Sequence, residues 1–193
     1  MQLYTVLAIC ILVLSVTGGL QPFQRILGMN RFQGAYLGLV VLTLSGFTLT
    51  PSPEMRLNVC VLILPLMLAV WAVQEGIRPG AFAAIFLFAG IALGLERTTV
   101  FSGVESGVLT GFIAGASAAA LADRPRTALA VAASVPPACA LLSSGLALAA
   151  GEYSALDMSR PALLDAQMCA LSFGGVLLCM YAAAKTGQRG EAQ

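Results

Sequence analysis

The sequence predicts an all-α membrane protein, a bundle of about seven transmembrane helices that forms one integral membrane domain over residues 1–193. Three observations predict this fold class. First, 59% of the residues are hydrophobic and only 10% are charged, whereas a soluble domain carries about 25% charged residues. Second, apolar runs that approach the length of a membrane span recur along the whole chain. Third, arginine and lysine are concentrated in alternate connecting segments, as they are in multi-pass membrane proteins.

The same composition excludes several classes of function. So few charged side chains cannot cover a water-facing surface, which excludes a soluble enzyme and a disordered chain. The net charge of +1 creates no field that would attract nucleic acid. There is no histidine, and the five cysteines lie inside apolar runs without a Cys-x-x-Cys pair. We therefore expect no metal site and no cofactor.

Seven stretches are candidates for membrane spans, because a helix needs about 20 residues to cross a hydrocarbon core of about 30 Å. The first has no basic residue in front of it and is expected to be a span rather than a cleaved signal. The fourth is the weakest, and if it is re-entrant the chain crosses six times. The predicted spans are residues 3–20, 34–49, 57–73, 81–95, 107–122, 128–150 and 162–184.

The basic residues of the connecting segments predict the orientation. Positive charge stays on the cytoplasmic side, so the more basic set of segments marks that side. The N-terminus is then outside and the C-terminus is cytoplasmic, which requires an odd number of spans. The cytoplasmic set holds Arg25, Arg31, Arg78, Arg124, Arg126, Lys185 and Arg189, and the opposite set holds Arg56, Arg97 and Arg160.

Prolines interrupt two of the predicted spans near their middles. Pro65 lies in the third span, near Asn58, and Pro136 and Pro137 lie in the sixth, after Ser134. A mid-helix proline removes a backbone hydrogen bond, and the freed carbonyl needs a neighbouring helix or a water-lined cavity. The two spans run in opposite directions, as in a 3+3 inverted repeat followed by one further span. Broken helices in such repeats form a transporter's midplane site. Two ordinary proline kinks are the alternative.

A row of small residues marks the fifth predicted span. Gly107, Gly111 and Gly115 are four residues apart and share one helix face. Such a face lets another helix pack closely, either in the same chain or in a homo-oligomer or partner subunit. The row favours tight static packing, and a sliding or gating surface is the alternative.

Asp165 is the ionisable residue closest to the interior of a predicted span. It follows Pro161, which suits the first turn of the last helix, and there a carboxylate stabilises the helix dipole. The alternative is a polar site outside the membrane. The two longest polar outer segments, residues 96–106 and 151–161, are expected to form the mouth of any such site, in which Asp165 would work with Glu152, Asp157 or Arg160.

Residues 25–73 and 123–178 resemble a domain-of-unknown-function family of small multi-pass membrane proteins from bacteria and archaea. The resembling pieces are Asn58-Val59 with Pro65, Arg124-Pro125 leading to Pro136-Pro137, and Asp165. Cys60-Val61 and Ala166 stand where such proteins carry glycines. The resemblance implies a multi-pass protein of a prokaryotic plasma membrane, with the lipid bilayer as its first partner, and it implies no activity.

Three functions agree with these patterns. The first is a transporter or channel for a small solute, which a polar cavity beside the prolines would favour. The second is a non-catalytic membrane scaffold or assembly subunit that docks through small-residue faces. The third is an intramembrane hydrolase in which Asp157 and Asp165 share a proton. The candidate solute-binding residues are Asn58, Pro65, Ser134, Pro136, Pro137 and Asp165.

Overall fold

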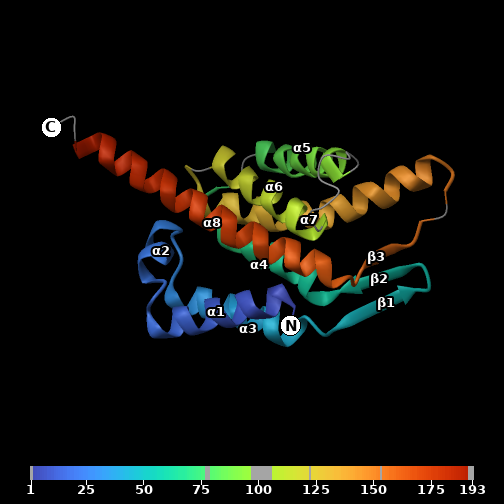
Figure 1. Ribbon diagram of the computed structural model, residues 1–193, viewed down its shortest axis with the longest axis horizontal. Coiled ribbons are helices and arrows are strands. Elements are labelled where there is room, and N and C mark those ends of the chain that lie inside the picture. The colour runs from blue at the N-terminus through green and yellow to red at the C-terminus, as the bar shows by residue number, and fades with distance from the viewer. Residues whose placement is uncertain (1, 77–78, 97–105, 122, 153, 191–193) are drawn as a thin grey trace.

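The computed structural model describes residues 2–76, 79–96, 106–121, 123–152 and 154–190, so Arg78 and Arg97 lie outside the described residues. The described residues are mostly helical and form eight helices and three short strands (Figure 1). The elements in chain order are α1 (Leu3–Thr17), α2 (Gln21–Ile26), α3 (Arg31–Leu44), β1 (Thr48–Ser52), β2 (Met55–Asn58), α4 (Val59–Val73), α5 (Pro79–Glu96), α6 (Ser106–Ala120), α7 (Pro125–Ala149), β3 (Leu156–Met158) and α8 (Pro161–Gly190).

Each of the seven predicted spans coincides with one helix, namely α1, α3, α4, α5, α6, α7 and α8. The predicted helical class is therefore confirmed, and the helix ends differ from the predicted span ends by at most six residues, at the end of α8. Two of the differences lie around the α3–α4 connection. The second predicted span continued to Leu49, but α3 ends at Leu44, and the third began at Leu57, but α4 begins at Val59. Both differences arise because the residues between these helices pair as strands.

The three strands form one small sheet, which an entirely helical prediction did not include. β1 and β2 are antiparallel, with Thr48 opposite Asn58 and Leu49 opposite Leu57. β3 pairs in parallel with β2, with Met55 opposite Leu156. The register shifts between Leu49 and Ser52, where Pro51 has no N–H to give to the ladder. The sheet joins the α3–α4 connection to the segment before α8.

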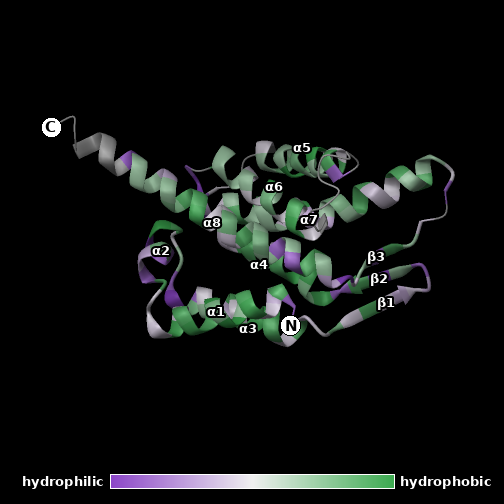
Figure 2. Ribbon diagram, viewed as in Figure 1, coloured by the Kyte–Doolittle hydropathy of each residue, from purple (hydrophilic) through white to green (hydrophobic). Residues whose placement is uncertain are grey.

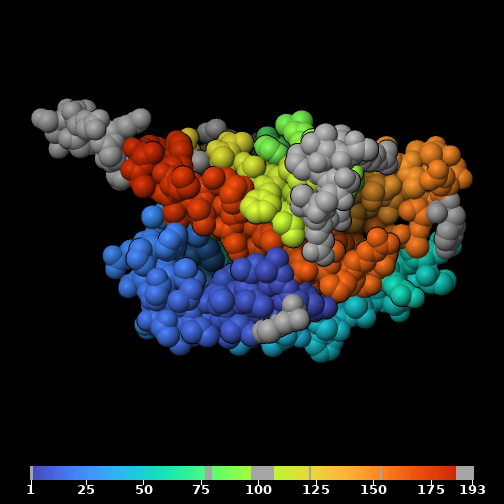
Figure 3. Space-filling model, viewed as in Figure 1, coloured from blue at the N-terminus to red at the C-terminus, as the bar shows by residue number. Residues whose placement is uncertain are grey.

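The helices run alternately between two ends of the molecule. We call the end that carries β1–β3 the sheet end and the opposite end, which carries α2, the α2 end. Helices α1, α4, α6 and α8 run from the sheet end to the α2 end, and α3, α5 and α7 run back (Figure 1). Figure 3 shows α8, in orange and red, passing between the blue N-terminal helices and the yellow-green α6. α8 therefore lies between the N-terminal helices and α6.

Helices α6 and α8 approach each other along the glycine row. A Cβ atom added to Gly111 would lie 2.6 Å from the Cβ of Cys169 and 2.8 Å from the carbonyl oxygen of Ala166. One added to Gly107 would lie 2.8 Å from the carbonyl oxygen of Ala162, and Gly115 faces Phe173 in the same way. The predicted small-residue face therefore contacts a helix of the same chain.

At the α2 end, α4 and α7 bind each other's termini. The carboxylate of Glu75, just after α4, accepts the backbone N–H groups of Arg126 at 3.2 Å and Thr127 at 3.1 Å, near the start of α7. In return, Nη1 of Arg124 donates to the carbonyls of Glu75 and Gly76. Gly76 has a φ of 75°, which glycine adopts without strain. These contacts satisfy backbone groups that a helix leaves open at its ends.

The outer surface of the bundle is largely apolar. Figure 2 shows hydrophobic residues over most of the helices and hydrophilic residues mainly near their ends and in the turns. Phe32 is 72% exposed, and Val16, Leu66 and Val70 are each more than 60% exposed. Among the described residues, Pro125–Ala149 and Pro161–Lys185 are long and apolar enough to cross a bilayer, although a core helix of a water-soluble protein can meet the same criteria. At this coarse level, the two helices indicate association with a membrane.

Candidate functional site

The prolines lie inside continuous helices and in packed surroundings. Pro136 and Pro137 are buried and Pro65 is half-buried. A proline at position i has no N–H for the carbonyl at i−4. The three prolines therefore free three carbonyls from their helical donors, namely those of Val61, Ala132 and Ala133.

A single side chain from α8 supplies donors to two of these carbonyls, those of Val61 and Ala133. Nε2 of Gln167 lies 3.0 Å from the oxygen of Val61 and 3.0 Å from the oxygen of Ala133. Gln167 is fully buried, and its Oε1 has no hydrogen-bond partner among the described residues. A neighbouring helix, rather than a water-lined cavity, thus satisfies these two carbonyls.

Gln167 was missed by the sequence analysis. The available signal was its position as an amide inside an apolar run, two residues after Asp165. Polar residues within a membrane span find hydrogen-bond partners on other helices. Nothing in the sequence indicated that its partners would be two of the proline-released carbonyls.

The side chains of Asn58 and Ser134 do not bind the carbonyls that the prolines release. Asn58 caps α4, because its Oδ1 accepts the N–H of Cys60 at 2.9 Å, and its Nδ2 donates to the carbonyl of Ser45 at 2.8 Å. The hydroxyl of Ser134 donates to the carbonyl of Ala130 at 2.7 Å within α7. Their contacts in the structure are thus with nearby backbone groups.

Asp165 caps a different helix from its own. Its Oδ1 accepts the backbone N–H of Tyr4 at 2.6 Å, at the start of α1, where Gln2 provides no side-chain cap. The structure therefore does not bring Asp165 together with Asp157, which bonds to Ser159 and Arg160. The paired carboxylates that the hydrolase hypothesis requires are not formed by these two residues.

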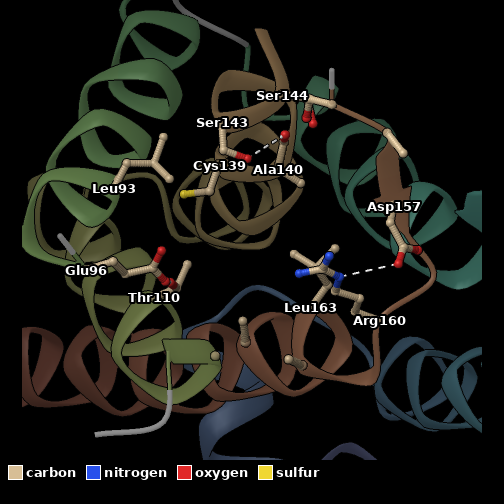
Figure 4. Close-up of a pocket in the computed structure, with 15 residues that line it drawn as sticks. Leu93, Glu96, Thr110, Cys139, Ala140, Ser143, Ser144, Asp157, Arg160 and Leu163 are labelled. Carbon is tan, nitrogen blue, oxygen red and sulfur yellow. Dashed lines mark hydrogen bonds and ion pairs between the residues drawn. The ribbon is translucent and has the colours of Figure 1, made fainter. Parts of the chain in front are cut away.

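A polar cavity lies at the sheet end, between α5, α6, α7 and the segment that leads into α8 (Figure 4). Its volume is about 290 Å³. We call this cavity the polar pocket. Its side chains combine three charged groups, several hydroxyls and a small apolar surface. The polar lining residues are Glu96, Thr110, Cys139, Ser143, Ser144, Ser154, Asp157 and Arg160, and the apolar ones include Leu93, Ala140, Leu163 and Ala166.

The charged groups of the polar pocket are held by specific hydrogen bonds. Oε1 of Glu96 accepts the hydroxyl of Thr110 at 2.5 Å. Oδ1 of Asp157 accepts the hydroxyl of Ser159 at 2.6 Å, and its Oδ2 accepts Nε of Arg160 at 3.3 Å. The Ser159 hydroxyl, then the Ser159 backbone N–H and then the Arg160 guanidinium lower the pKa of Asp157 below its usual value. Asp157 is therefore an anion paired with Arg160 at neutral pH.

No protein-family model, curated protein or solved structure matches this chain. The resemblance to a family of small multi-pass membrane proteins stays a prediction.

The polar pocket lies next to the layer of the bundle that contains the prolines and Gln167, but the two do not overlap. Ala166 lines the pocket and is followed by Gln167, and Cys139 lines it two residues after Pro137. None of the six candidate solute-binding residues from the sequence lines the pocket. The two outer segments predicted as a mouth, in contrast, contribute Glu96, Ser154, Asp157 and Arg160. The polar cavity thus lies at the sheet end of the bundle, above a packed layer that contains the prolines.

Proposed function

We propose that this protein crosses the membrane seven times, with the sheet end outside and the α2 end in the cytoplasm. Three features support the proposal: the alternating direction of seven apolar helices, the apolar outer surface, and the distribution of basic residues. The described basic residues of the α2 end are Arg25, Arg31, Arg124, Arg126, Lys185 and Arg189, and those of the sheet end are Arg56 and Arg160. This distribution agrees with the positive-inside rule. The predicted 3+3 repeat stays a prediction, which the antiparallel, proline-containing α4 and α7 support.

Cysteine labelling tests this topology. In a background with the five native cysteines changed to alanine, Ser52→Cys lies in exposed β1 and Gln21→Cys in exposed α2. A membrane-impermeant maleimide applied to intact cells is expected to label Ser52→Cys, and to label Gln21→Cys only after the membrane is permeabilised. Labelling of both in intact cells, or of neither, would contradict seven crossings.

We propose further that the protein is a transporter for a small polar solute, which enters the polar pocket from outside. The observation that carries this function is the pocket itself, a polar cavity of about 290 Å³ in an otherwise apolar bundle. Its floor adjoins the packed layer around Gln167, which closes the path toward the α2 end. A pocket open at one end and closed at the other corresponds to one state of alternating access.

Solute flux into proteoliposomes tests transport. The double variant Ser143→Leu/Ser144→Leu fills the polar pocket with two larger side chains and is expected to abolish flux. Gly145→Leu is the matched control on the same helix, because open space surrounds Gly145. Flux that persists in the double variant, or no flux of any polar solute with wild-type protein, would contradict the proposal.

A second candidate function, a scaffold or assembly subunit, is favoured by one face of α5. A Cβ atom added to Gly90 or Gly94 would meet nothing within 4 Å, and the apolar side chains of Phe86 and Ile91 are exposed. An open small-residue face is suited to close helix docking by a second copy or a partner subunit. If this function is correct, Gly90→Leu/Gly94→Leu separates a complex in detergent that wild-type protein forms, measured by light scattering after size-exclusion chromatography.

A further inference from the structure

Two opposite charges face each other across the polar pocket. Glu96 comes from the end of α5, and Arg160 precedes α8. Figure 4 shows the Arg160 guanidinium directed into the cavity, with Glu96 on the opposite side. They do not form an ion pair with each other, because the pairs among the described residues join Arg126 to Glu75, Arg160 to Asp157 and Lys185 to Asp123.

Each of these groups has hydrogen-bonding capacity that the described protein does not use. Thr110 occupies one oxygen of Glu96, and no described group binds the other. Asp157 occupies Nε of Arg160, and no described group binds its two terminal nitrogens. A guanidinium with free terminal nitrogens can bind a carboxylate through two hydrogen bonds. A free carboxylate oxygen can accept a hydrogen bond from an ammonium group.

We propose that the polar pocket binds a small zwitterion of the amino-acid class, with its carboxylate on Arg160 and its ammonium group on Glu96. This inference rests on the proposed transport function and names its substrate class. The hydroxyls of Ser143 and Ser144 line another side of the pocket, where they can meet polar atoms of the solute (Figure 4). Leu93, Ala140 and Leu163 provide an apolar surface for a short carbon chain.

The pocket fits other small ions less well. Its described lining contains no aromatic ring, so it lacks the surface that binds quaternary ammonium groups. The one cation among its described lining residues, Arg160, is already paired with Asp157, so a dianion would lack positive partners there. A simple cation would meet Glu96 but would also face the Arg160 guanidinium. A molecule with both charges satisfies both poles.

Binding to the full-length protein in nanodiscs tests the inference. The probes are glycine, β-alanine, 4-aminobutyrate and 6-aminohexanoate, which place the two charges at increasing separations. The tightest of them is then compared with its amide, which keeps only the cation, and its N-acetyl derivative, which keeps only the anion. Since a hydrogen bond to a charged group contributes about 1.5–3 kcal/mol, each loss of a charge is expected to weaken binding about 10- to 100-fold.

Variants assign each charge to its partner. Glu96→Gln is expected to weaken binding of the zwitterion and of its amide about 10-fold or more and to leave binding of the N-acetyl derivative unchanged. Arg160→Gln is expected to weaken binding of the zwitterion and its N-acetyl derivative and to leave binding of the amide unchanged. Glu54→Gln and Arg56→Gln, which change the same charges in the neighbouring hairpin outside the pocket lining, are the matched controls and are expected to bind like wild type. Thermal unfolding of each variant checks that it is folded.

The outcomes separate this inference from the function on which it rests. If the amide or the N-acetyl derivative binds as tightly as the zwitterion, or a neutral polyol binds and all zwitterions do not, the zwitterion class is wrong while solute binding stands. If no probe of any charge class binds and none is transported, both proposals are wrong.

Discussion

Gln167 donates two hydrogen bonds from one nitrogen to two helices that run in opposite directions. Helix carbonyls point toward the C-terminus of their own helix. The oxygen of Val61 therefore points along α4 toward the α2 end, and that of Ala133 points along α7 toward the sheet end. A carboxamide offers two hydrogens on one nitrogen, whereas a carboxylate offers none. Gln167 is thus the residue at which the two proline-interrupted helices are joined through α8.

Substitution of Gln167 by leucine is expected to destabilise the protein by about 1–4 kcal/mol, because two buried carbonyls lose their donors. The cost is expected to shrink by half or more in a Pro65→Ala/Pro137→Ala background, where residues 65 and 137 regain the N–H groups that serve Val61 and Ala133. Unfolding followed by the fluorescence of Trp71, the single tryptophan, measures all four proteins. An equal cost of Gln167→Leu in both backgrounds would contradict this role.

The lowered pKa of Asp157 predicts that the stability of the protein depends on pH. This pKa is lowered in the folded protein by the Ser159 hydroxyl, then by the Ser159 backbone N–H and then by Arg160. A depressed carboxylate pKa stabilises the folded state above the ordinary aspartate value of about 3.9, and this contribution is lost as the pH falls through the lower folded value. The melting temperature of wild type is therefore expected to fall more steeply on acidification than that of Asp157→Asn. Glu54→Gln, the control in the hairpin, is expected to follow wild type.

Helix contacts determine whether a glycine-to-alanine substitution raises or lowers the stability of the protein. On α6, alanine at Gly111 would place its Cβ 2.6 Å from that of Cys169 on α8. Such overpacking is expected to cost about 1–3 kcal/mol. On α5, alanine at Gly90 enters open space and is expected to stabilise the helix by up to about 1 kcal/mol through its higher helix propensity. Melting temperatures that shift in the same direction for both variants would contradict the packing described here.

The helices could be predicted from the sequence because a long apolar run without charges favours a helix, whatever the rest of the chain does. The hairpin could not, because Thr48–Ser52 and Met55–Asn58 are short and become strands only through pairing with each other and with Leu156–Met158. The boundaries at Leu44 and Val59 depend on that pairing. A helical period in the sequence carries no information about a contact made 100 residues further along the chain.

The candidate site could be predicted only in part, because some of its contacts depend on how the helices pack. Charged residues bordering apolar runs indicated Glu96 and Arg160 as neighbours of a mouth, because the ends of adjacent helices meet at one side of a bundle. The prolines correctly indicated interrupted hydrogen bonding, but which group would replace the missing donors depends on how α8 packs. Gln167 and the cap that Asp165 provides for Tyr4 are both consequences of that packing.

The two ends of the whole molecule differ in how they are held together. At the α2 end, Glu75, Arg124 and Arg126 bind backbone groups of neighbouring elements directly. At the sheet end, the hairpin and the polar pocket leave charged groups with free hydrogen-bonding capacity. The proposed transport function would require this asymmetry, since one end must stay assembled while the other exchanges solute.

The lengths of the helices predict a preference for thin bilayers. Helices α1, α3, α4, α5 and α6 contain between 14 and 18 residues, which corresponds to about 21–27 Å against a hydrocarbon core of about 30 Å. Mismatch costs a fraction of a kcal/mol per Å, so five short helices together create a measurable strain. The melting temperature in nanodiscs is therefore expected to be higher in lipids with 14-carbon chains than in lipids with 18-carbon chains. Lengthening α5 by inserting Leu-Ala-Leu-Ala after Leu87, on its exposed surface, is expected to weaken this preference. A melting temperature that instead rises with bilayer thickness in wild type would contradict spans formed by these five short helices.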